Sequence, residues 1–398
     1  MSKCVTVYTQ AYNVENYIEQ CIKSVLSQTF QDFEWILVEN GSTDKTREII
    51  RKYAALDERI KPDYFDVNQD GFTNYYIAEK ADGRYIVKID SDDWIEPEYL
   101  EKLIAPFEDP DVDISICGAV NYEEETGRET PHEYGELDGV YSKSDIEKQF
   151  IEMRSYMGTY WGKVFRREIF CSILPDMKEI GEKLKKGDNF GGDVAFALCY
   201  LGECKKLAFV NERMYHYRIH NNSYATRTIG TNRVFSCLTL RETEHHFLHK
   251  VNAYTEQNVI MVDLLFWQNI EQLFKNIIRA DWDTDQKIKT ISEVCANKDL
   301  QLLRKEAYNS KVRTILMGDI AWCYMNAGNS KYLKNVLMLL EPDIFDSISN
   351  ETYEWMRENQ ILMSYIIMGE FDNAKRYMEE ITTGNNVDYI RELQQRMH

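Results

Sequence analysis

Short apolar strands alternate with amphipathic helices through the first third of the chain, and no other feature restricts the fold as strongly. Strand-like runs are VTVYT (5–9), EWILVEN (34–40), YIVKID (85–90) and DISICGAV (113–120). Helices are predicted between and after them: from Val14 to about Gln28 behind a capping Asn13, after the turn at Asn40-Gly41, over residues 72–80 and after Pro97. Strands without polar alternation, separated by helices, predict an α/β fold with a largely parallel sheet covered on both faces.

The chain changes character at about Thr226, beyond which helical periodicity dominates and Pro342 is the only proline. Two segments combine an apolar helix, a glycine-centred turn and a second amphipathic helix: AWCYMNAGNSKYLKNVLMLL around Gly328 and SYIIMGEFDNAKRYMEEI around Gly369. We therefore predict a first domain over residues 1–225 and an all-α domain of helical hairpins over residues 226–398. The hairpins are either degenerate tetratricopeptide-like repeats or a plain helical bundle.

Composition and charge exclude several classes of partner. Hydrophobic residues make up 44% of the 398 residues, which is enough for globular cores. The net charge of −19 is concentrated in the front half and argues against a nucleic-acid partner and an anionic membrane surface. The nine scattered cysteines, without CxxC pairs or zinc spacing, fit a reducing compartment. With no signal peptide or integral membrane segment in view, we expect a cytoplasmic protein.

Aspartates gather where the strand YIVKID ends. Along an extended strand Asp90 and Asp92 would face the same way and Ser91 the other. Two converging carboxylates offer hard oxygen ligands, which suit Mg²⁺ or Mn²⁺ better than zinc. The alternative is that these acids stabilise the N-terminus of the following helix, but Asp90 lies before that turn. We therefore predict a divalent metal at Asp90 and Asp92, with Asp92 as the direct ligand.

A second polar strand end is ILVENGSTDKT, where Glu39 precedes the Asn40-Gly41 turn. A carboxylate here can accept a hydrogen bond from the N3–H of uracil, a donor that cytosine lacks. Guanine offers a similar donor, so UDP and GDP both stay open. A turn with a helix cap at Ser42 or Asp44 is the simpler interpretation of the same residues.

Taken together, the segments at residues 5–46 and 85–103 resemble glycosyltransferase family 2. The family implies a GT-A fold and inverting transfer of a sugar from a nucleotide sugar with the help of a divalent metal. Here the resemblance implies that the first strand end and Glu39 lie beside the base and ribose, and that the D-x-D aspartates hold the metal-bound diphosphate. The nucleotide-sugar-binding residues it implies are Gln10, Ala11, Tyr12, Glu39, Asn74, Asp90, Ser91 and Asp92.

Later segments extend the resemblance to about residues 4–227. GGDVAFALCYLGECKKLAFVNERMYHYRIHNNSYATR is similar to the family's general-base segment and maps the base onto Asp193. YWGKVFRREIF is similar to the segment that borders the acceptor cleft. The residues that these segments imply on the acceptor or diphosphate side are Trp161, Lys163, Arg218 and His220.

Three positions depart from the family pattern. Gln10 replaces a frequent proline, Gly192 replaces the first acid of an acidic pair, and Asn74 replaces an arginine that would contact the diphosphate. Lys163, Arg218 or His220 would then have to supply the missing charge. Asp193 follows two glycines, so it is also a candidate helix cap.

The resemblance predicts an inverting glycosyltransferase that uses a UDP-sugar, Mn²⁺ or Mg²⁺, and a glycan or protein acceptor. The helical domain would form a homodimer or dock the acceptor. One alternative is a nucleotidyltransferase, although its usual glycine-rich basic loop is replaced by QAYNVENYI. Another is a weakened glycosyltransferase that acts as a scaffold through its helical tail; the changes at Gly192 and Asn74 favour it, and the intact D-x-D segment weighs against it.

Overall fold

The structure, a computed structural model, describes residues 4–69, 73–132, 137–188, 190–220, 232–280 and 297–305, with positions 282, 286, 289–290 and 293–294. The chain divides into two compact units, one of residues 1–185, 191–228 and 242–259 and one of residues 186–190, 229–241 and 260–398. Both predicted hairpins, around Gly328 and Gly369, lie outside the described residues. The predicted domain boundary at residue 225 stays a prediction.

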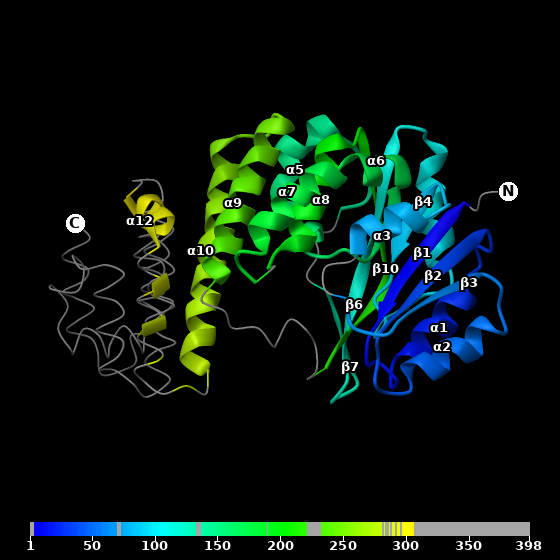
Figure 1. Cartoon of the computed structure of the whole chain (residues 1–398). Coiled ribbons are helices and arrows are strands. Elements are labelled where there is room, and N and C mark those ends of the chain that lie inside the picture. Colours follow the sequence, from blue (N-terminus) through cyan, green and yellow to red (C-terminus); the bar gives the residue numbers. More distant parts are fainter. Residues whose placement is uncertain are drawn as a thin grey trace, which may run out of the picture. The chain divides into compact units, whose positions relative to one another are not determined.

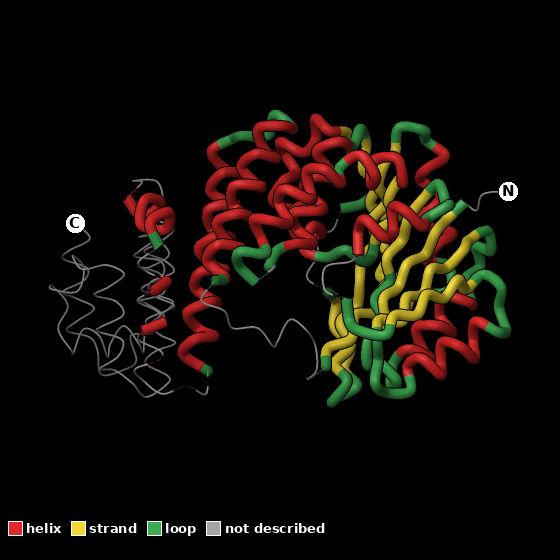
Figure 2. Tube along the Cα trace, viewed as in Figure 1, coloured by secondary structure: helices red, strands yellow, loops and turns green. Residues whose placement is uncertain are grey.

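The first unit is built on a mixed sheet, shown in yellow in Figure 2 with helices in red. Its helices and strands appear in the order β1 (Val5–Ala11), α1 (Ile18–Leu26), β2 (Phe33–Asn40), α2 (Thr46–Ala54), β3 (Ile60–Phe65), α3 (Thr73–Lys80), β4 (Tyr85–Lys88), β5 (Trp94–Ile95), α4 (Tyr99–Ile104), η1 (Ala105–Glu108), β6 (Val112–Glu123), β7 (Arg128–Pro131), β8 (Gly139–Ser142), η2 (Lys143–Asp145), α5 (Ile146–Ser155), η3 (Tyr156–Gly158), β9 (Lys163–Arg166), α6 (Arg167–Ser172), α7 (Leu174–Leu184), α8 (Gly192–Glu203) and β10 (Lys206–Ile219). Figure 1 shows these elements along the chain.

Within the described residues the sheet has ten strands in the order β3-β2-β1-β4-β9-β6-β10-β5, with β7 paired to β6 and β8 to β10. Strands β1 to β4 run parallel, and so do β6 and β10. Strand β9 lies antiparallel between β4 and β6. The expectation of a largely parallel sheet is therefore correct for the front strands, whereas the sheet as a whole is mixed.

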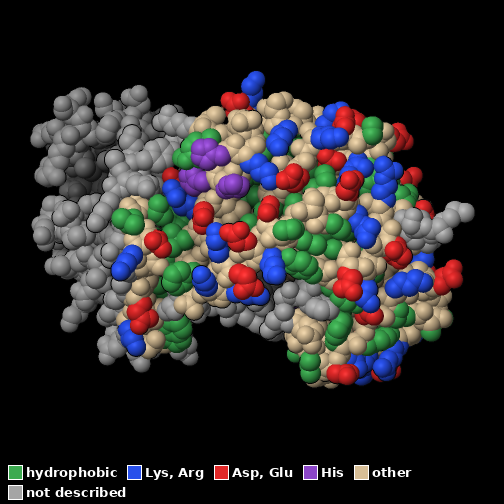
Figure 3. Space-filling model, turned by 45° about the horizontal axis from the view of Figure 1, so that its top comes forward, with side chains coloured by type: hydrophobic (Ala, Val, Ile, Leu, Met, Phe, Trp, Pro, Cys, Tyr) green, Lys and Arg blue, Asp and Glu red, His purple; other side chains and the backbone are tan. Residues whose placement is uncertain are grey.

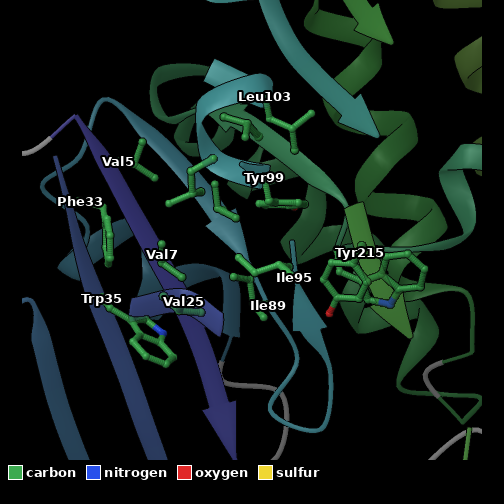
Figure 4. Close-up of a cluster of buried hydrophobic side chains, with 14 of the residues drawn as sticks. Val5, Val7, Val25, Phe33, Trp35, Ile89, Ile95, Tyr99, Leu103 and Tyr215 are labelled. Atoms are coloured by element: carbon green, nitrogen blue, oxygen red, sulfur yellow. The ribbon is translucent and has the colours of Figure 1, made fainter. Parts of the chain in front are cut away.

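One face of the sheet is filled by aliphatic and aromatic side chains (Figure 4). Val5 and Val7 of β1 and Phe33 and Trp35 of β2 share this core with Val25 of α1. The opposite face carries a group of aromatic rings: Tyr160, Phe165, Phe170, Phe196 and Tyr200. Successive residues of β9 point to the two cores, since side chains alternate along a strand.

Helix α1 begins later than the sequence predicts. Asn13 has a φ of 52°, and its side-chain oxygen accepts a hydrogen bond from the backbone N–H of Thr43 at 2.9 Å. The regular helix starts at Ile18, after a turn in which Val14 O accepts the N–H of Tyr17. Asn13 therefore joins two loops at the carboxyl edge of the sheet and does not cap the helix.

The second unit contains parts of α9 (Arg233–Lys250) and α10 (Glu256–Arg279), and α12 (Lys298–Lys305). Its buried apolar residues on α10 recur every three or four positions: Val262, Phe266, Ile270, Leu273 and Ile277. Arg241 donates through Nε to Oδ1 of buried Asp263 at 2.6 Å. In the described part of the chain, no helix has the length and apolarity needed to cross a membrane.

On the face shown in Figure 3, described acidic and basic side chains are interspersed. The excess negative charge is therefore not gathered into a single acidic patch on that face.

Candidate functional site

The aspartate-rich segment forms a turn at the carboxyl end of β4. The strand ends at Lys88, and the N–H of Asp93 donates to the carbonyl of Asp90 at 3.2 Å. The segment is therefore a turn and not the extended strand from which we predicted that Asp90 and Asp92 face the same way. The side chains of Asp90 and Asp92 are nevertheless both partly open to solvent, at 34% and 29% exposed. Ser91 is buried.

Asp93 holds this turn against strand β10. Its Oδ1 accepts the backbone N–H of Arg218 at 2.8 Å and its Oδ2 accepts the hydroxyl of Tyr215 at 2.7 Å. The Tyr215 oxygen in turn accepts the N–H of Asp90 at 3.1 Å. Burial, together with the nearby charges of Asp92 and Asp90, raises the pKa of Asp93 well above its ordinary value. Sequence reasoning missed this residue, although a third aspartate directly after a buried strand was a visible signal.

Arg218 fixes the backbone of the same turn. Its Nε donates to the carbonyl of Asp92 at 2.8 Å and a terminal nitrogen donates to Gln20 Oε1 at 2.7 Å. The guanidinium lies 5.0 Å from the ring centre of Tyr17 and 4.8 Å from that of Trp94. The side chain is thus engaged on several sides, and its predicted role on the diphosphate or acceptor side stays a prediction.

His220 is next to the predicted metal ligand. Its Nε2 lies 3.0 Å from Oδ2 of Asp92, and its ring is 4.9 Å from that of Tyr17. Its Nδ1 is buried without a hydrogen-bond partner among the described residues. Burial and the charge of Asp90 raise the pKa of Asp92, and the hydrogen bond to His220 opposes this rise.

The donor set of the turn fits a hard divalent cation. Asp90 and Asp92 present partly exposed carboxylates from one turn, and carboxylate oxygens suit Mg²⁺ and Mn²⁺. The described part of the chain contains no group of three or more His, Cys, Asp or Glu side chains arranged to hold a metal. A cation here would therefore complete its shell with water or substrate oxygens, as Mg²⁺ commonly does.

Asp193 lies in the first turn of α8 and is exposed. The N-cap residue of α8 is Gly191, whose φ of 80° is in the left-handed region, so the prediction that Asp193 caps the helix is wrong. Crowding by surrounding protein atoms raises the pKa of Asp193, while Lys88 lowers it and Asp90 raises it further. These electrostatic interactions place Asp193 in the neighbourhood of the aspartate turn.

The predicted base-binding residues meet at the ends of β1 and β2. Ala11 pairs with Glu39 in the parallel ladder, and Tyr12 is 42% exposed beside it. Gln10 Oε1 accepts the hydroxyl of Tyr8 at 3.4 Å. The Glu39 carboxylate is fully buried, so its contact with uracil stays a prediction.

Two of the predicted site residues, Asn74 and Trp161, contact tyrosines. Asn74 Oδ1 accepts the hydroxyl of Tyr160 at 2.8 Å. Trp161 stacks on Tyr215, with ring centres 4.4 Å apart and planes inclined by 5°. Trp161 and Lys163 are both buried, and their contact with an acceptor stays a prediction.

Lys163 is buried among neutral oxygens. Its Nζ donates to Thr159 O at 2.6 Å, to Thr159 Oγ1 at 2.9 Å and to Trp161 O at 3.1 Å. Burial lowers the pKa of Lys163 to about 7. These hydrogen bonds tie the 159–161 segment to the first residue of β9.

Residues 6–173 match the model of the glycosyl transferase family 2 domain. The putative glycosyltransferase EpsH of Bacillus subtilis is 30% identical over 305 residues, which cover 75% of this chain and 84% of EpsH. The chain belongs to glycosyltransferase family 2. Within the family, glycosyltransferase GlyA of Streptococcus pneumoniae is 29% identical over 227 residues, which cover 55% of this chain and 31% of GlyA.

A solved structure shares the fold of this family 2 chain. Residues 1–349 of S. aureus TarS, in complex with UDP, superpose with a TM-score of 0.53 at 16% identity, covering 87% of this chain and 94% of TarS 1–349. The family model and EpsH confirm the family resemblance, and this structural likeness confirms the GT-A-like mixed α/β sheet. The family match contains the aspartate turn and ends before Asp193, Arg218 and His220, which the fold brings toward it.

Proposed function

We propose that this glycosyltransferase is a metal-dependent, inverting enzyme that moves a sugar from a UDP-sugar to a glycan or protein acceptor. The observation that carries the proposal is the arrangement of carboxylates on two separate elements. Asp90 and Asp92 lie in the turn after β4, and Asp193 lies in the first turn of α8 within electrostatic reach of Asp90. Inverting transfer needs two such groups, one at the leaving diphosphate and one at the attacking hydroxyl.

Each group has a distinct role in this proposal. Asp92, with Asp90 beside it, would hold Mn²⁺ or Mg²⁺, which supplies positive charge to the departing diphosphate. Asp193 would accept the proton of the acceptor hydroxyl as that oxygen attacks the anomeric carbon from the opposite side. Its exposure lets an acceptor reach it.

UDP is the proposed donor nucleotide because the fold relative TarS 1–349 was solved with UDP and with UDP-GlcNAc. The base would lie at the ends of β1 and β2, beside Tyr12. Guanine has a comparable ring N–H donor, so the binding of GDP-sugars must be compared with that of UDP-sugars. A thermal-shift panel of UDP- and GDP-sugars, with and without Mn²⁺, should show stabilisation by a UDP-sugar that requires the metal.

The role of Asp193 is tested by Asp193→Asn, with Asp176→Asn as the matched control. Both aspartates are exposed and lie in the first turn of a helix, but Asp176 belongs to α7. Asp193→Asn should bind UDP and Mn²⁺ as wild type does, and its transfer rate should fall roughly 10²–10⁴-fold, the usual contribution of a general base. Asp176→Asn should be unchanged. Near-normal turnover of Asp193→Asn would rule Asp193 out as the base.

Binding, transfer and product assays together separate the alternatives. A weakened glycosyltransferase acting as a scaffold would bind UDP and Mn²⁺ without transferring or hydrolysing any sugar. A nucleotidyltransferase would instead release pyrophosphate from a nucleoside triphosphate and a sugar phosphate.

A further inference from the structure

Lys88 is a cation at the centre of the candidate site. It is the last residue of β4, and its Nζ lies 3.1 Å from Oδ1 of Asp90. The same Nζ is 5.0 Å from the ring centre of Tyr160, and the side chain is 19% exposed. Burial lowers the pKa of Lys88, but the charges of Asp90 and Asp193 outweigh burial, and the pKa lies above its ordinary value. The ammonium therefore interacts with carboxylates from two different elements.

The other lysine and arginine side chains of the site donate to neutral groups. Lys163 directs its three described hydrogen bonds to neutral oxygens of the 159–161 segment. Arg218 donates to a backbone carbonyl and to Gln20. Among the described residues, Lys88 is the only lysine or arginine that forms an ion pair with a carboxylate of the aspartate turn.

We propose that Lys88 is a built-in cation that holds the Asp90 carboxylate when no divalent metal is bound and competes with the metal for it. The proposal rests on the proposed function, because it assumes a divalent cation at Asp90 and Asp92. Two positive charges within a few ångströms repel, so the ammonium weakens metal binding at the turn. When the metal leaves, the Lys88 ammonium still offsets part of the repulsion between the aspartates of the turn.

Lys88 also links the metal side to the proposed base. Its charge attracts Asp193 as well as Asp90, and it lies on the only described strand that leads into the aspartate turn. As a positioning residue it would keep the Asp193 carboxylate directed toward the turn. Its removal should therefore have opposite effects on metal affinity and on transfer.

The test measures the dissociation constant of Mn²⁺ alone by calorimetry on the full chain, for wild type, Lys88→Met, Lys88→Gln and Lys88→Arg. Lys88→Met and Lys88→Gln should bind Mn²⁺ about tenfold more tightly, because they remove a positive charge that lies beside the ligand Asp90. Their transfer rate at saturating Mn²⁺ should fall about tenfold. Lys88→Arg keeps the charge and should stay close to wild type in affinity.

Lys206→Met is the matched control. Lys206 is also a strand lysine in an ion pair with an aspartate, at 2.8 Å from Asp109, but that pair lies outside the aspartate turn. It should leave both readouts unchanged. Adding Asp90→Asn to Lys88→Met should abolish the gain in Mn²⁺ affinity, because the released ligand is then gone.

The outcomes distinguish this proposal from the proposed function. Unchanged or weaker Mn²⁺ binding in both neutral variants, with native circular dichroism, would overturn the role of Lys88 while leaving the metal site intact. If neither wild type nor the variants bound Mn²⁺, with or without UDP, the metal site itself would be wrong and the role of Lys88 with it. Tighter binding in the neutral variants that Asp90→Asn reverses supports the competition.

Discussion

Glu39 and Arg47 form an ion pair that anchors the end of β2 to helix α2 and to the end of β3. The Glu39 carboxylate is fully buried; its Oε2 accepts Arg47 Nε, and its Oε1 accepts the N–H of Ser42 at 2.6 Å. Arg47 also donates to the carbonyl of Phe65. The orientation of the carboxylate is therefore fixed within the protein itself, before any nucleotide arrives.

Arg47→Ala should destabilise the protein by about 2–3 kcal/mol, because it leaves a buried carboxylate without its partner. Urea unfolding followed by circular dichroism measures the change. Arg51→Ala is the control: Arg51 lies on the same helix and 5.2 Å from the ring centre of Tyr64, which Arg47 also approaches. Equal stability of the two variants would show that the ion pair contributes little.

Asp93→Ala should lower the free energy of unfolding by at least about 2 kcal/mol, since it removes the acceptor of the Arg218 N–H and of the Tyr215 hydroxyl. It should also weaken binding of UDP with Mn²⁺, because the turn that carries Asp90 and Asp92 loses its hold on β10. The measurements are urea unfolding and calorimetry. Asp111→Ala, at a half-exposed aspartate, should be neutral in both. An Asp93→Ala protein of wild-type stability would contradict the assigned role.

Gly191→Ala should reduce sugar transfer with only a small loss of stability. A φ of 80° costs a residue with a Cβ roughly 1–2 kcal/mol, so the backbone that leads into Asp193 would shift to relieve the strain. Gly192→Ala is a close control, since an added Cβ there meets no atom within 4 Å and its φ is not positive. Transfer rate and unfolding free energy are measured for both. Equal rates would mean that the Gly191 conformation does not position Asp193.

Lys163 should make stability rise with pH above neutrality. The pKa of Lys163 is about 7 in the folded protein and about 10.4 for an unperturbed lysine, so between these values the unfolded chain binds more protons. Unfolding then becomes less favourable as pH rises from about 7 to 10, whereas below pH 7 the full cost of burying the charge is present. Because buried cysteines titrate in the same range, the decisive quantity is the difference in unfolding free energy between wild type and Lys163→Met from pH 6 to 10, which should shift in favour of wild type as pH rises. The exposed Lys178→Met should keep the wild-type slope.

The sequence predicted the elements whose signal is local. Strands β1, β2 and β4 are continuous apolar runs, and the Asn40-Gly41 turn has the positive φ that glycine favours, 78° at Gly41. The antiparallel strand β9 could not be found in this way, because it has four residues and its neighbours β4 and β6 come from distant parts of the chain. The late start of α1 likewise accompanies a long-range contact, the hydrogen bond from the N–H of Thr43 to Asn13.

The candidate site was predicted where residue type alone carried the signal, as for Asp90, Asp92 and Glu39. The residues that contact them could not be predicted from the sequence. Asp93 is recognised through Tyr215 and Arg218, more than 120 residues away, and its buried position depends on that contact. Lys88 stands two residues before Asp90, but its interaction with Asp193 requires the fold to bring the start of α8 near the end of β4.

The hold that β10 has on the aspartate turn sets a lower limit on the piece of this protein that can be studied alone. A fragment that stopped at residue 173, where the family match ends, would contain Asp90, Asp92 and Asp93 and the strands β1 to β4. It would lack both groups that Asp93 binds, and a buried carboxylate without donors favours the unfolded chain. A fragment cut at residue 173 would therefore be unable to hold the aspartate turn in its folded conformation.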